Sequence, residues 1–210
     1  METLPLQKTG YQEFNDTTIY SVIQTLTQKN NQIYKVEDSL LMPKTNSNKF
    51  HNSLSQEFGL NAFPFHTDGA HRIIPPKWLI LEYKGLRPSN SATTLLDTLH
   101  LQNDRVNENF FFNEIYLVTG GKISFLTTLV NKTQCKSPIF RWNSLIMKKL
   151  NSKEHNNLNI FERSISHRFE WIKGKILVID NWRILHGREA INEDDKTNRI
   201  IHRYNLTPIN

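Results

Sequence analysis

Two residues that can bind a metal ion, His66 and Asp68, lie two positions apart in the segment Phe63-Pro-Phe-His-Thr-Asp-Gly-Ala-His71. On a β-strand, side chains at i and i+2 point to the same face, so this imidazole and this carboxylate would meet at one point. A third ligand is needed, and His186 in the later segment 177–188 offers one. Two histidines and one carboxylate on one face of an octahedron leave three positions open, which is typical of non-haem Fe(II) oxygenases.

A His-x-Asp pair alone is unspecific, because the chain has eight histidines and a distant partner is easily found. Two arginines downstream of His186, Arg199 and Arg203, add specificity. On a strand they would share one face, and two guanidinium groups that point into a barrel require anions. A dicarboxylate cosubstrate would supply one, since arginine binds carboxylates bidentately. The alternative is a surface strand with both arginines exposed.

The elements that would position these residues are mostly strands. Residues 16–29 have helical periodicity with Asp16 as a candidate N-cap, whereas residues 36–60 are polar and irregular. Residues 144–151 fit a short helix, and residues 171–176 fit a hairpin around a Lys-Gly turn. Seven or eight short strands with few helices favour a β-sandwich or barrel. The expected strands cover residues 78–83, 115–118, 123–130, 138–142, 168–172, 175–179 and 199–204.

Composition indicates a globular domain without a membrane span. The chain has 210 residues, of which 38% are hydrophobic and 22% charged, so a sizeable core can form. No run approaches 18 apolar residues, and the N-terminus lacks the apolar stretch of a secretory signal. The one cysteine, Cys135, excludes an intrachain disulfide and a thiolate-rich zinc site. We therefore expect a cytoplasmic protein with no membrane partner.

The charge of +6 hints at anionic partners. The basic residues are scattered rather than gathered in a stripe, so a nucleic-acid partner is not expected. A small anionic substrate or cosubstrate explains the charge equally well. The chain also lacks the Gly-x-Ser-x-Gly, phosphate-loop and His-Glu-x-x-His patterns of other enzyme classes.

Several motifs, in order, resemble one family. They are His66-Thr-Asp68-Gly, a Pro-Pro pair at 75–76, Pro-Ser at 88–89, Thr-Leu at 94–95, the signature Asp-Asn-Trp-Arg-Ile-Leu-His-Gly-Arg at 180–188, and the pair Arg199 and Arg203. The chain resembles the taurine dioxygenase/clavaminate synthase-like family of Fe(II)- and 2-oxoglutarate-dependent oxygenases. The similarity runs from about residue 63 to residue 204. It implies a jelly-roll barrel, the double-stranded β-helix, over residues 61–210, with residues 1–60 as a helical or irregular flank of the same single domain.

The resemblance also implies roles for individual residues. His66, Asp68 and His186 would bind iron, and Arg199 would bind the distal carboxylate of 2-oxoglutarate. Thr94 would assist there. The stretch before Thr94 reads Asn-Ser-Ala-Thr where relatives often have Gly-Gly, so Thr93 is the alternative.

Three further residues surround these positions. The resemblance places Arg203 near the primary substrate, and His71 could touch that substrate or lie on the rim of the site. Arg188 follows the third ligand closely enough to hold a carboxylate behind it.

The implied reaction converts 2-oxoglutarate and O2 to succinate and CO2 while a substrate C–H bond is hydroxylated. Because Asp68 occupies the position that halogenating relatives leave to chloride, halogenation is disfavoured, whereas desaturation and cyclisation remain open. The expected substrate is a small metabolite, such as an amino acid or a biosynthetic intermediate. Two alternatives are a non-catalytic metal- or ligand-binding regulatory protein on the same barrel and an oxygenase that acts on a macromolecule.

Overall fold

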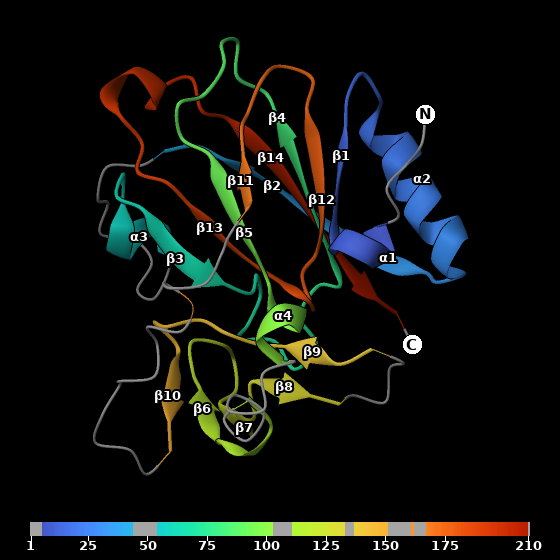
Figure 1. Cartoon of the computed structure of the whole chain (residues 1–210), viewed down its shortest axis with the longest axis vertical. Coiled ribbons are helices and arrows are strands. Elements are labelled where there is room, and N and C mark those ends of the chain that lie inside the picture. Colours follow the sequence, from blue (N-terminus) through green and yellow to red (C-terminus); the bar gives the residue numbers. More distant parts are fainter. Residues whose placement is uncertain are drawn as a thin grey trace.

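Two antiparallel sheets face each other and form the main body of the molecule (Figure 1). The computed structural model describes residues 6–43, 54–102, 111–132, 137–150, 161 and 167–209. The larger sheet has five strands in the order β1-β12-β4-β14-β2. Their bounds are Tyr11–Phe14 (β1), Ile176–Asp180 (β12), Trp78–Tyr83 (β4), Ile201–Pro208 (β14) and Tyr34–Leu41 (β2).

The second sheet carries the metal-binding candidates. Its strand order is β11-β5-β13-β3, so neighbours in this sheet come from distant parts of the sequence. This pairing of two antiparallel sheets confirms the expected mostly-β, double-stranded β-helix fold. The strand bounds are His167–Phe169 (β11), Thr93–Asp97 (β5), Ile184–Arg188 (β13) and Phe63–His66 (β3).

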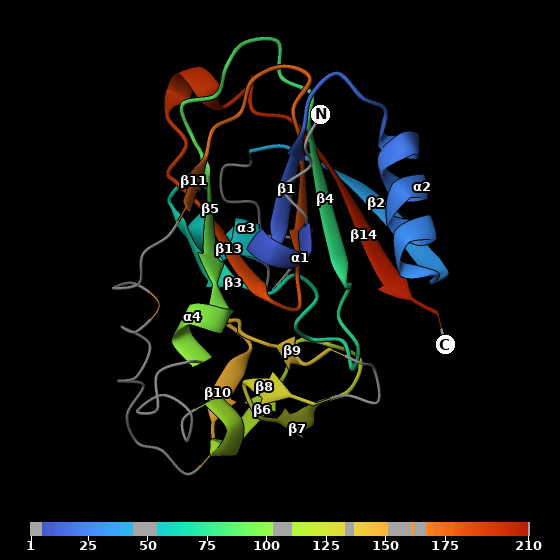
Figure 2. The same cartoon turned by 45° about the vertical axis from the view of Figure 1, so that its right-hand side comes forward.

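The space between the two sheets is filled by apolar side chains from both. Figure 2 shows the sheets nearly edge-on, with β5 and β13 across from β4 and β14. Leu79 and Ile179 of the larger sheet and Leu95 and Ile184 of the smaller one belong to one cluster in which every member is at most 6% exposed. Burial of such side chains stabilises the fold by about 1.5–3 kcal/mol each. Trp171 lies in this cluster and Trp182 is also buried.

A helix covers the outer face of the larger sheet (Figure 2). This helix, α2 (Ile19–Asn30), buries Val22 and Leu26 against β4, β12 and β14. Its N-cap is Thr18, whose hydroxyl accepts a hydrogen bond from the backbone N–H of Ser21. The expected cap, Asp16, is therefore wrong: it lies two residues earlier with a positive φ of 51°.

A smaller unit of short strands packs below the two sheets (Figure 1). Strands β10, β6 and β7 form one sheet, and β8 pairs with β9. Its buried residues, among them Tyr116 and Trp142, share a cluster with Leu96 and Leu185 of the main body. The bounds are Tyr116–Val118 (β6), Phe125–Thr127 (β7), Val130–Asn131 (β8), Ile139–Phe140 (β9) and Met147–Lys149 (β10).

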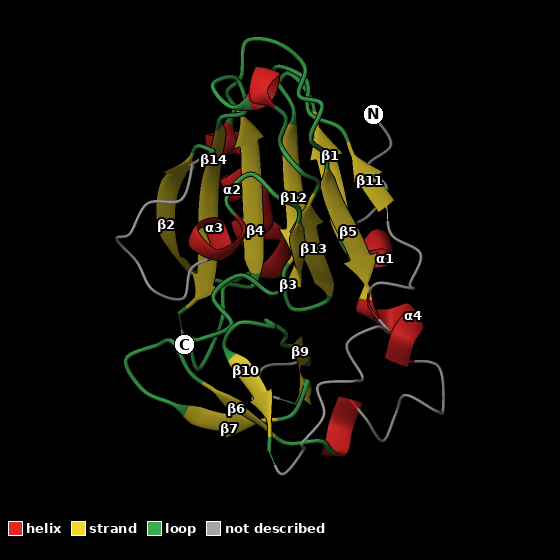
Figure 3. Ribbon diagram, turned by 90° about the vertical axis from the view of Figure 1, so that its left-hand side faces the viewer, coloured by secondary structure: helices red, strands yellow, loops and turns green. Residues whose placement is uncertain are grey.

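The described residues also contain short helical segments outside the strands and α2. Figure 3 shows three of them, α1, α3 and α4, in red. Their bounds are Leu6–Thr9 (α1), Leu54–Phe58 (α3) and Thr98–Gln102 (α4), and a 3-10 turn, η1, covers Glu193–Asp195.

Three local expectations are wrong. Residues 36–41 of the segment expected to be irregular belong to the edge strand β2 (Tyr34–Leu41), which pairs along its whole length with β14. Residues 144–146 make a turn that leads into β10, not a helix. The turn at residues 173–174 exists, but it connects β11 of one sheet to β12 of the other, so it is no hairpin. In each case pairing with a distant strand decided the outcome. Cys135 and residues 44–53 lie outside the described residues.

No helix among the described residues is long and apolar enough to cross a membrane.

Candidate metal centre

The three expected metal ligands meet in the structure. His66 is the last residue of β3 and His186 lies in β13, and the two are direct partners in the register of these antiparallel strands. Asp68 follows β3 after one intervening residue. The potential ligand atoms of the three side chains all lie within 4.8 Å of one another. Strand pairing thus brings together residues that are 120 positions apart in the sequence.

One carboxylate oxygen of Asp68 faces both imidazoles. Oδ1 of Asp68 is 3.6 Å from Nε2 of His66 and 4.0 Å from Nε2 of His186. The three residues are between 6% and 8% exposed. Three ligand atoms of this kind, converging in a buried position, fit a divalent cation of the Fe(II) type.

A hydrogen bond fixes which nitrogen of His66 is available. Nδ1 of His66 lies 3.0 Å from the carbonyl oxygen of Pro64. A carbonyl only accepts, so Nδ1 carries the proton and Nε2 presents its lone pair toward Asp68 and His186. A backbone partner on the far nitrogen is the usual way in which proteins orient a metal-binding histidine.

The turn that holds Asp68 is anchored by Asn181. The side-chain oxygen of Asn181 accepts from the Asp68 backbone N–H at 2.9 Å, and its amide nitrogen donates to the Asp68 and Pro76 carbonyls at 3.0 and 2.8 Å. The next residue, Gly69, has a φ of +67°, and a Cβ there would lie 2.7 Å from a carbon of Pro76. This turn therefore requires glycine. Asn181, which belongs to the 180–188 signature, has the structural function of holding the Asp68 turn, and the spacing of the signature alone does not show this.

Arg203 contacts the second oxygen of the same carboxylate. Nη1 of Arg203 donates to Oδ2 of Asp68 at 3.0 Å, and Nε donates to Oγ of Ser39 at 3.2 Å. Burial alone would raise the pKa of Asp68, but Arg203 and the two histidines together bring it well below its usual range. Burial lowers the pKa of His186 to about 3. The site therefore holds an ionised carboxylate and a neutral His186.

Arg199 is a buried cation that lines the same cavity as the metal-binding residues. It is 8% exposed, and its Nε donates to the Ser91 carbonyl at 3.3 Å. Among the described residues it forms no ion pair. Burial lowers its pKa to about 10, although nearby Asp195 opposes this shift. A buried guanidinium without an anion is costly, so this position favours an anionic ligand.

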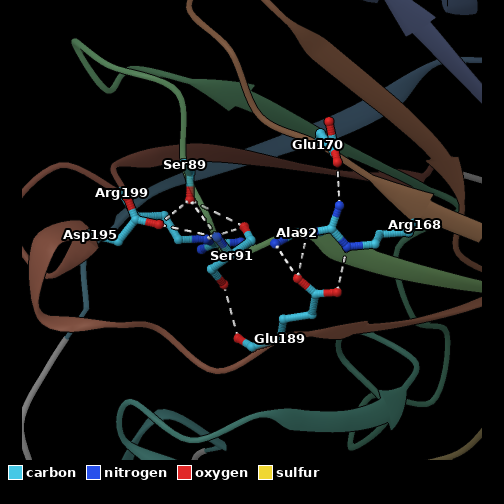
Figure 4. A network of polar contacts seen from close by, with 8 residues as sticks. All are labelled: Ser89, Ser91, Ala92, Arg168, Glu170, Glu189, Asp195 and Arg199. Carbon is cyan, nitrogen blue, oxygen red and sulfur yellow. Dashed lines mark hydrogen bonds and ion pairs between the residues drawn. The ribbon is translucent and has the colours of Figure 1, made fainter.

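Asp195 and Glu189 fix the loop that faces Arg199 (Figure 4). Oδ2 of Asp195 accepts from the Ser89 hydroxyl at 2.8 Å and from the backbone N–H groups of Asn90 and Ser91 at 2.6 and 3.1 Å. Glu189 accepts from the Ala92 N–H at 3.1 Å and pairs with Arg168. Because its carboxylate accepts hydrogen bonds from this loop, Asp195 forms no ion pair with Arg199. Its negative charge still opposes the lowering of the Arg199 pKa by burial.

The two threonine candidates lie on opposite faces of β5. Thr93 pairs with Arg188, is 3% exposed and lines the cavity. Thr94 pairs with Gly187 on the other face, where its hydroxyl lies 2.8 Å from the position of a Cβ on Gly187. The structure therefore places the alternative Thr93, rather than Thr94, on the cavity that Arg199 also lines. The hydroxyl of Thr93 accepts from Nε1 of Trp171 at 3.0 Å, which leaves its own hydrogen free to donate.

A cavity of about 410 Å³ contains the site and is lined by residues of both sheets. His71 is exposed and lines it, as expected for a residue on the rim. Arg188 also lines it, but the expectation that Arg188 holds a carboxylate is wrong. Its Nη2 donates to the Gly59 and Asn61 carbonyls at 2.8 and 2.5 Å, and its guanidinium stacks on the ring of Phe63.

Sequence reasoning missed three residues of the site. Asn181 had a signal, because it lies within the 180–188 signature. Ser39 had none, since its strand was expected to be irregular. Asn205, two positions after Arg203 on β14, lines the cavity and is 8% exposed, and its Oδ1 has no hydrogen-bond partner in the described part of the chain. The strand period of two would have placed Asn205 on the face of Arg203.

Comparison with known proteins agrees with this geometry. Residues 158–205 match the family model described as "Taurine catabolism dioxygenase TauD, TfdA family". This segment contains His186, Arg199 and Arg203. A search of curated proteins found no match.

Solved structures that include two named oxygenases have a similar fold. AAD-2, in complex with Mn(II) and N-oxalylglycine, aligns with a TM-score of 0.70 and 15% identity over 98% of this chain and 87% of that chain. The oxygenase OrfP, in complex with Fe and alpha-ketoglutaric acid, aligns with a TM-score of 0.65 and 14% identity over 96% of this chain and 75% of that one. Asparagine oxygenase, in complex with Fe(II), 2S,3S-3-hydroxyasparagine and succinate, aligns with a TM-score of 0.61 and 13% identity over 82% of this chain. This chain spans only 56% of the asparagine oxygenase.

The fold and the site define a class: a double-stranded β-helix protein with two histidines and one carboxylate buried at a cavity lined by both sheets. Within this class, the family match confirms the resemblance to the taurine dioxygenase-like Fe(II)- and 2-oxoglutarate-dependent oxygenases.

Proposed function

We propose that this protein is an Fe(II)- and 2-oxoglutarate-dependent dioxygenase that hydroxylates an unactivated C–H bond of a small metabolite. The observation that carries the proposal is the convergence of His66, Asp68 and His186 on a cavity that Arg199 also lines, where Arg199 is buried and has no ion pair among the described residues. The triad supplies a metal site with open positions, and Arg199 supplies the cation that a dicarboxylate requires.

In this proposal, Arg199 and Thr93 bind the distal carboxylate of 2-oxoglutarate. Arg199 offers its Nη groups, and Thr93 offers a hydroxyl hydrogen because Trp171 already occupies one of its lone pairs. The Asp195 network keeps Ser91 in place, so its carbonyl orients Arg199 through Nε. These contacts position the cosubstrate before reaction and reduce the entropic cost of ordering it.

The remaining residues hold and shield the reacting groups. His66, Asp68 and His186 would hold the iron, which supplies the redox chemistry that activates O2 when bound. Pro64 orients His66, and Asn181 keeps the Asp68 turn rigid. The low exposure of the triad excludes bulk water, which limits side reactions of a strong oxidant.

For the primary substrate we favour a small polar metabolite such as an amino acid. The cavity of about 410 Å³ suits such a molecule. His71 at the rim and the side-chain oxygen Oδ1 of Asn205, which has no hydrogen-bond partner among the described residues, offer polar contacts. The neighbours bound to 3-hydroxyasparagine and to (3S)-hydroxy-L-Arg support the same substrate class. We further propose that residues 1–210 act as one domain, in the cytoplasm and without a nucleic-acid partner.

The test is succinate formation from 2-oxoglutarate under Fe(II), ascorbate and O2, with a panel of amino acids and related metabolites. We expect succinate to form only when iron is present, and a member of the panel to accelerate it. A His186→Ala variant is the control, since it should retain the fold and lose the turnover. Iron binding without any succinate would instead favour a non-catalytic binding protein, and acceleration only by nucleic acid or protein would favour a macromolecular substrate.

A further inference from the structure

The two oxygens of the Asp68 carboxylate face different groups. Its Oδ1 faces Nε2 of both histidines, at 3.6 and 4.0 Å, whereas its Oδ2 accepts from Nη1 of Arg203 at 3.0 Å. Asp68 is 8% exposed, and the Arg203 side chain is 29% exposed. The ion pair is thus largely shielded from solvent, where a charge-assisted hydrogen bond is stronger than at the surface.

Arg203 is itself held in place by the larger sheet. It is a direct register partner of Ser39 in the β14–β2 pair, and its Nε donates to Oγ of Ser39 at 3.2 Å. Two donors of one planar guanidinium are therefore fixed, one on β2 and one on the carboxylate. The tether to Ser39 therefore fixes the direction from which the guanidinium approaches Oδ2 of Asp68.

We propose that Arg203, oriented by Ser39, is a positioning residue for the metal-binding carboxylate. By occupying Oδ2, it leaves Oδ1 as the oxygen available to a cation between the two histidines. The family resemblance assigns this arginine to the primary substrate, but here its position is accounted for by Asp68 and Ser39. The inference rests on the proposed function, since it requires that the triad binds a metal ion.

The experiment measures Co(II) affinity by calorimetry and the Co(II) absorption spectrum in the native protein and in three variants. In Arg203→Met we expect binding to weaken about 10- to 100-fold, the range typical for loss of a residue that orients a metal ligand, together with a changed spectrum. Arg203→Lys should recover part of the affinity, because it restores one donor. Ser39→Ala should weaken binding less than Arg203→Met, because it removes the tether of Arg203 and leaves the carboxylate contact.

Arg72→Met is the matched control. Arg72 also lines the cavity and pairs with an acid, Glu37, but it contacts none of the triad. We expect native Co(II) affinity and spectrum in this variant.

Unchanged or tighter Co(II) binding by Arg203→Met would overturn the proposal. If Arg203 only repelled the cation through its charge, its removal would strengthen binding. If Arg203→Met binds Co(II) weakly but has lost its native thermal transition, the test depends on the two other variants. Ser39→Ala and Arg203→Lys, both folded, must then show affinities between those of the native protein and Arg203→Met. Without that gradation the proposal fails. If the native protein binds Co(II) no better than His186→Ala does, the metal site itself is wrong, which is a failure of the proposed function and a distinct result.

Discussion

Replacing Arg199 by methionine should separate cosubstrate binding from stability. Met fills most of the same space and removes the charge. Arg199 is 8% exposed, and its Nε donates only to the Ser91 carbonyl among the described residues. Loss of one partner of a buried, hydrogen-bonded charge pair costs about 2–5 kcal/mol. The dissociation constant of the cosubstrate should therefore rise about 30- to 4,000-fold.

The metal-free protein should respond differently. In the absence of ligand the Arg199 charge is buried with no ion pair in the described part of the chain, and this burial lowers its pKa to about 10. Removing such a charge relieves its desolvation cost, so the unfolding free energy of Arg199→Met should be equal to or higher than that of the native protein. A cation required by the fold itself would give the opposite sign.

Calorimetric titration of N-oxalylglycine into Mn(II)-loaded protein measures the affinity without turnover, and urea unfolding of the metal-free protein measures stability. Arg72→Met is again the matched control and should change the N-oxalylglycine affinity less than threefold. Native affinity for N-oxalylglycine in Arg199→Met would refute the assignment of Arg199. A loss of several kcal/mol in the unfolding free energy would show that the arginine serves the fold.

Three other substitutions test the scaffold of the site. Asn181→Ala removes three buried hydrogen bonds around Asp68, so urea unfolding should show a loss of roughly 2–4 kcal/mol. Thr93→Val should weaken N-oxalylglycine binding about fivefold, corresponding to one hydrogen bond of ~1 kcal/mol, whereas Thr94→Val should not. Equal effects of the two substitutions would contradict the conclusion that Thr93, and not Thr94, lies on the cavity face of β5. Asp195→Ala leaves three donors of the 89–91 loop without their acceptor. It should lower the unfolding free energy by about 3 kcal/mol and also weaken N-oxalylglycine binding, and native affinity would mean that the loop does not orient Arg199.

The sequence predicted the residues that have local signals. The close spacing of His66 and Asp68 is a local signal, although only His66 lies in β3 and Asp68 lies in the turn that follows. The segment around His186 has a recognisable signature. Strands β4 and β12 were predictable because their apolar runs are long and rich in β-branched and aliphatic residues. Arg199 and Arg203 were expected to share a face, and both do line the cavity.

The sequence could not predict features that depend on tertiary pairing. Strand β2 alternates polar and apolar residues only weakly, and its hydrogen bonds come from β14, more than 150 positions later. For the same reason Ser39, which orients Arg203, was missed. The choice between Thr93 and Thr94 depends on the register of β5 against β13, and a shift of one residue reverses the face.

The sequence also did not predict the hydrogen-bond partners of the arginines that line the cavity. Arg188 was expected to hold a carboxylate, yet it donates to two backbone carbonyls of the preceding loop. Arg203 was expected near the primary substrate, and in the structure it lines the cavity and donates to Asp68, a contact that the sequence did not predict. An arginine in a motif predicts that its guanidinium needs a hydrogen-bond or ion-pair partner. Which group is the partner depends on loops and strands outside the motif.

The most direct test of the central claim is anaerobic binding of 2-oxoglutarate to the Fe(II)-loaded protein, followed by visible absorption. Chelation of the metal by the keto acid should produce a charge-transfer band that requires both Fe(II) and 2-oxoglutarate and is absent in His186→Ala. A native protein that binds Fe(II) yet shows no such band at saturating 2-oxoglutarate would contradict the account.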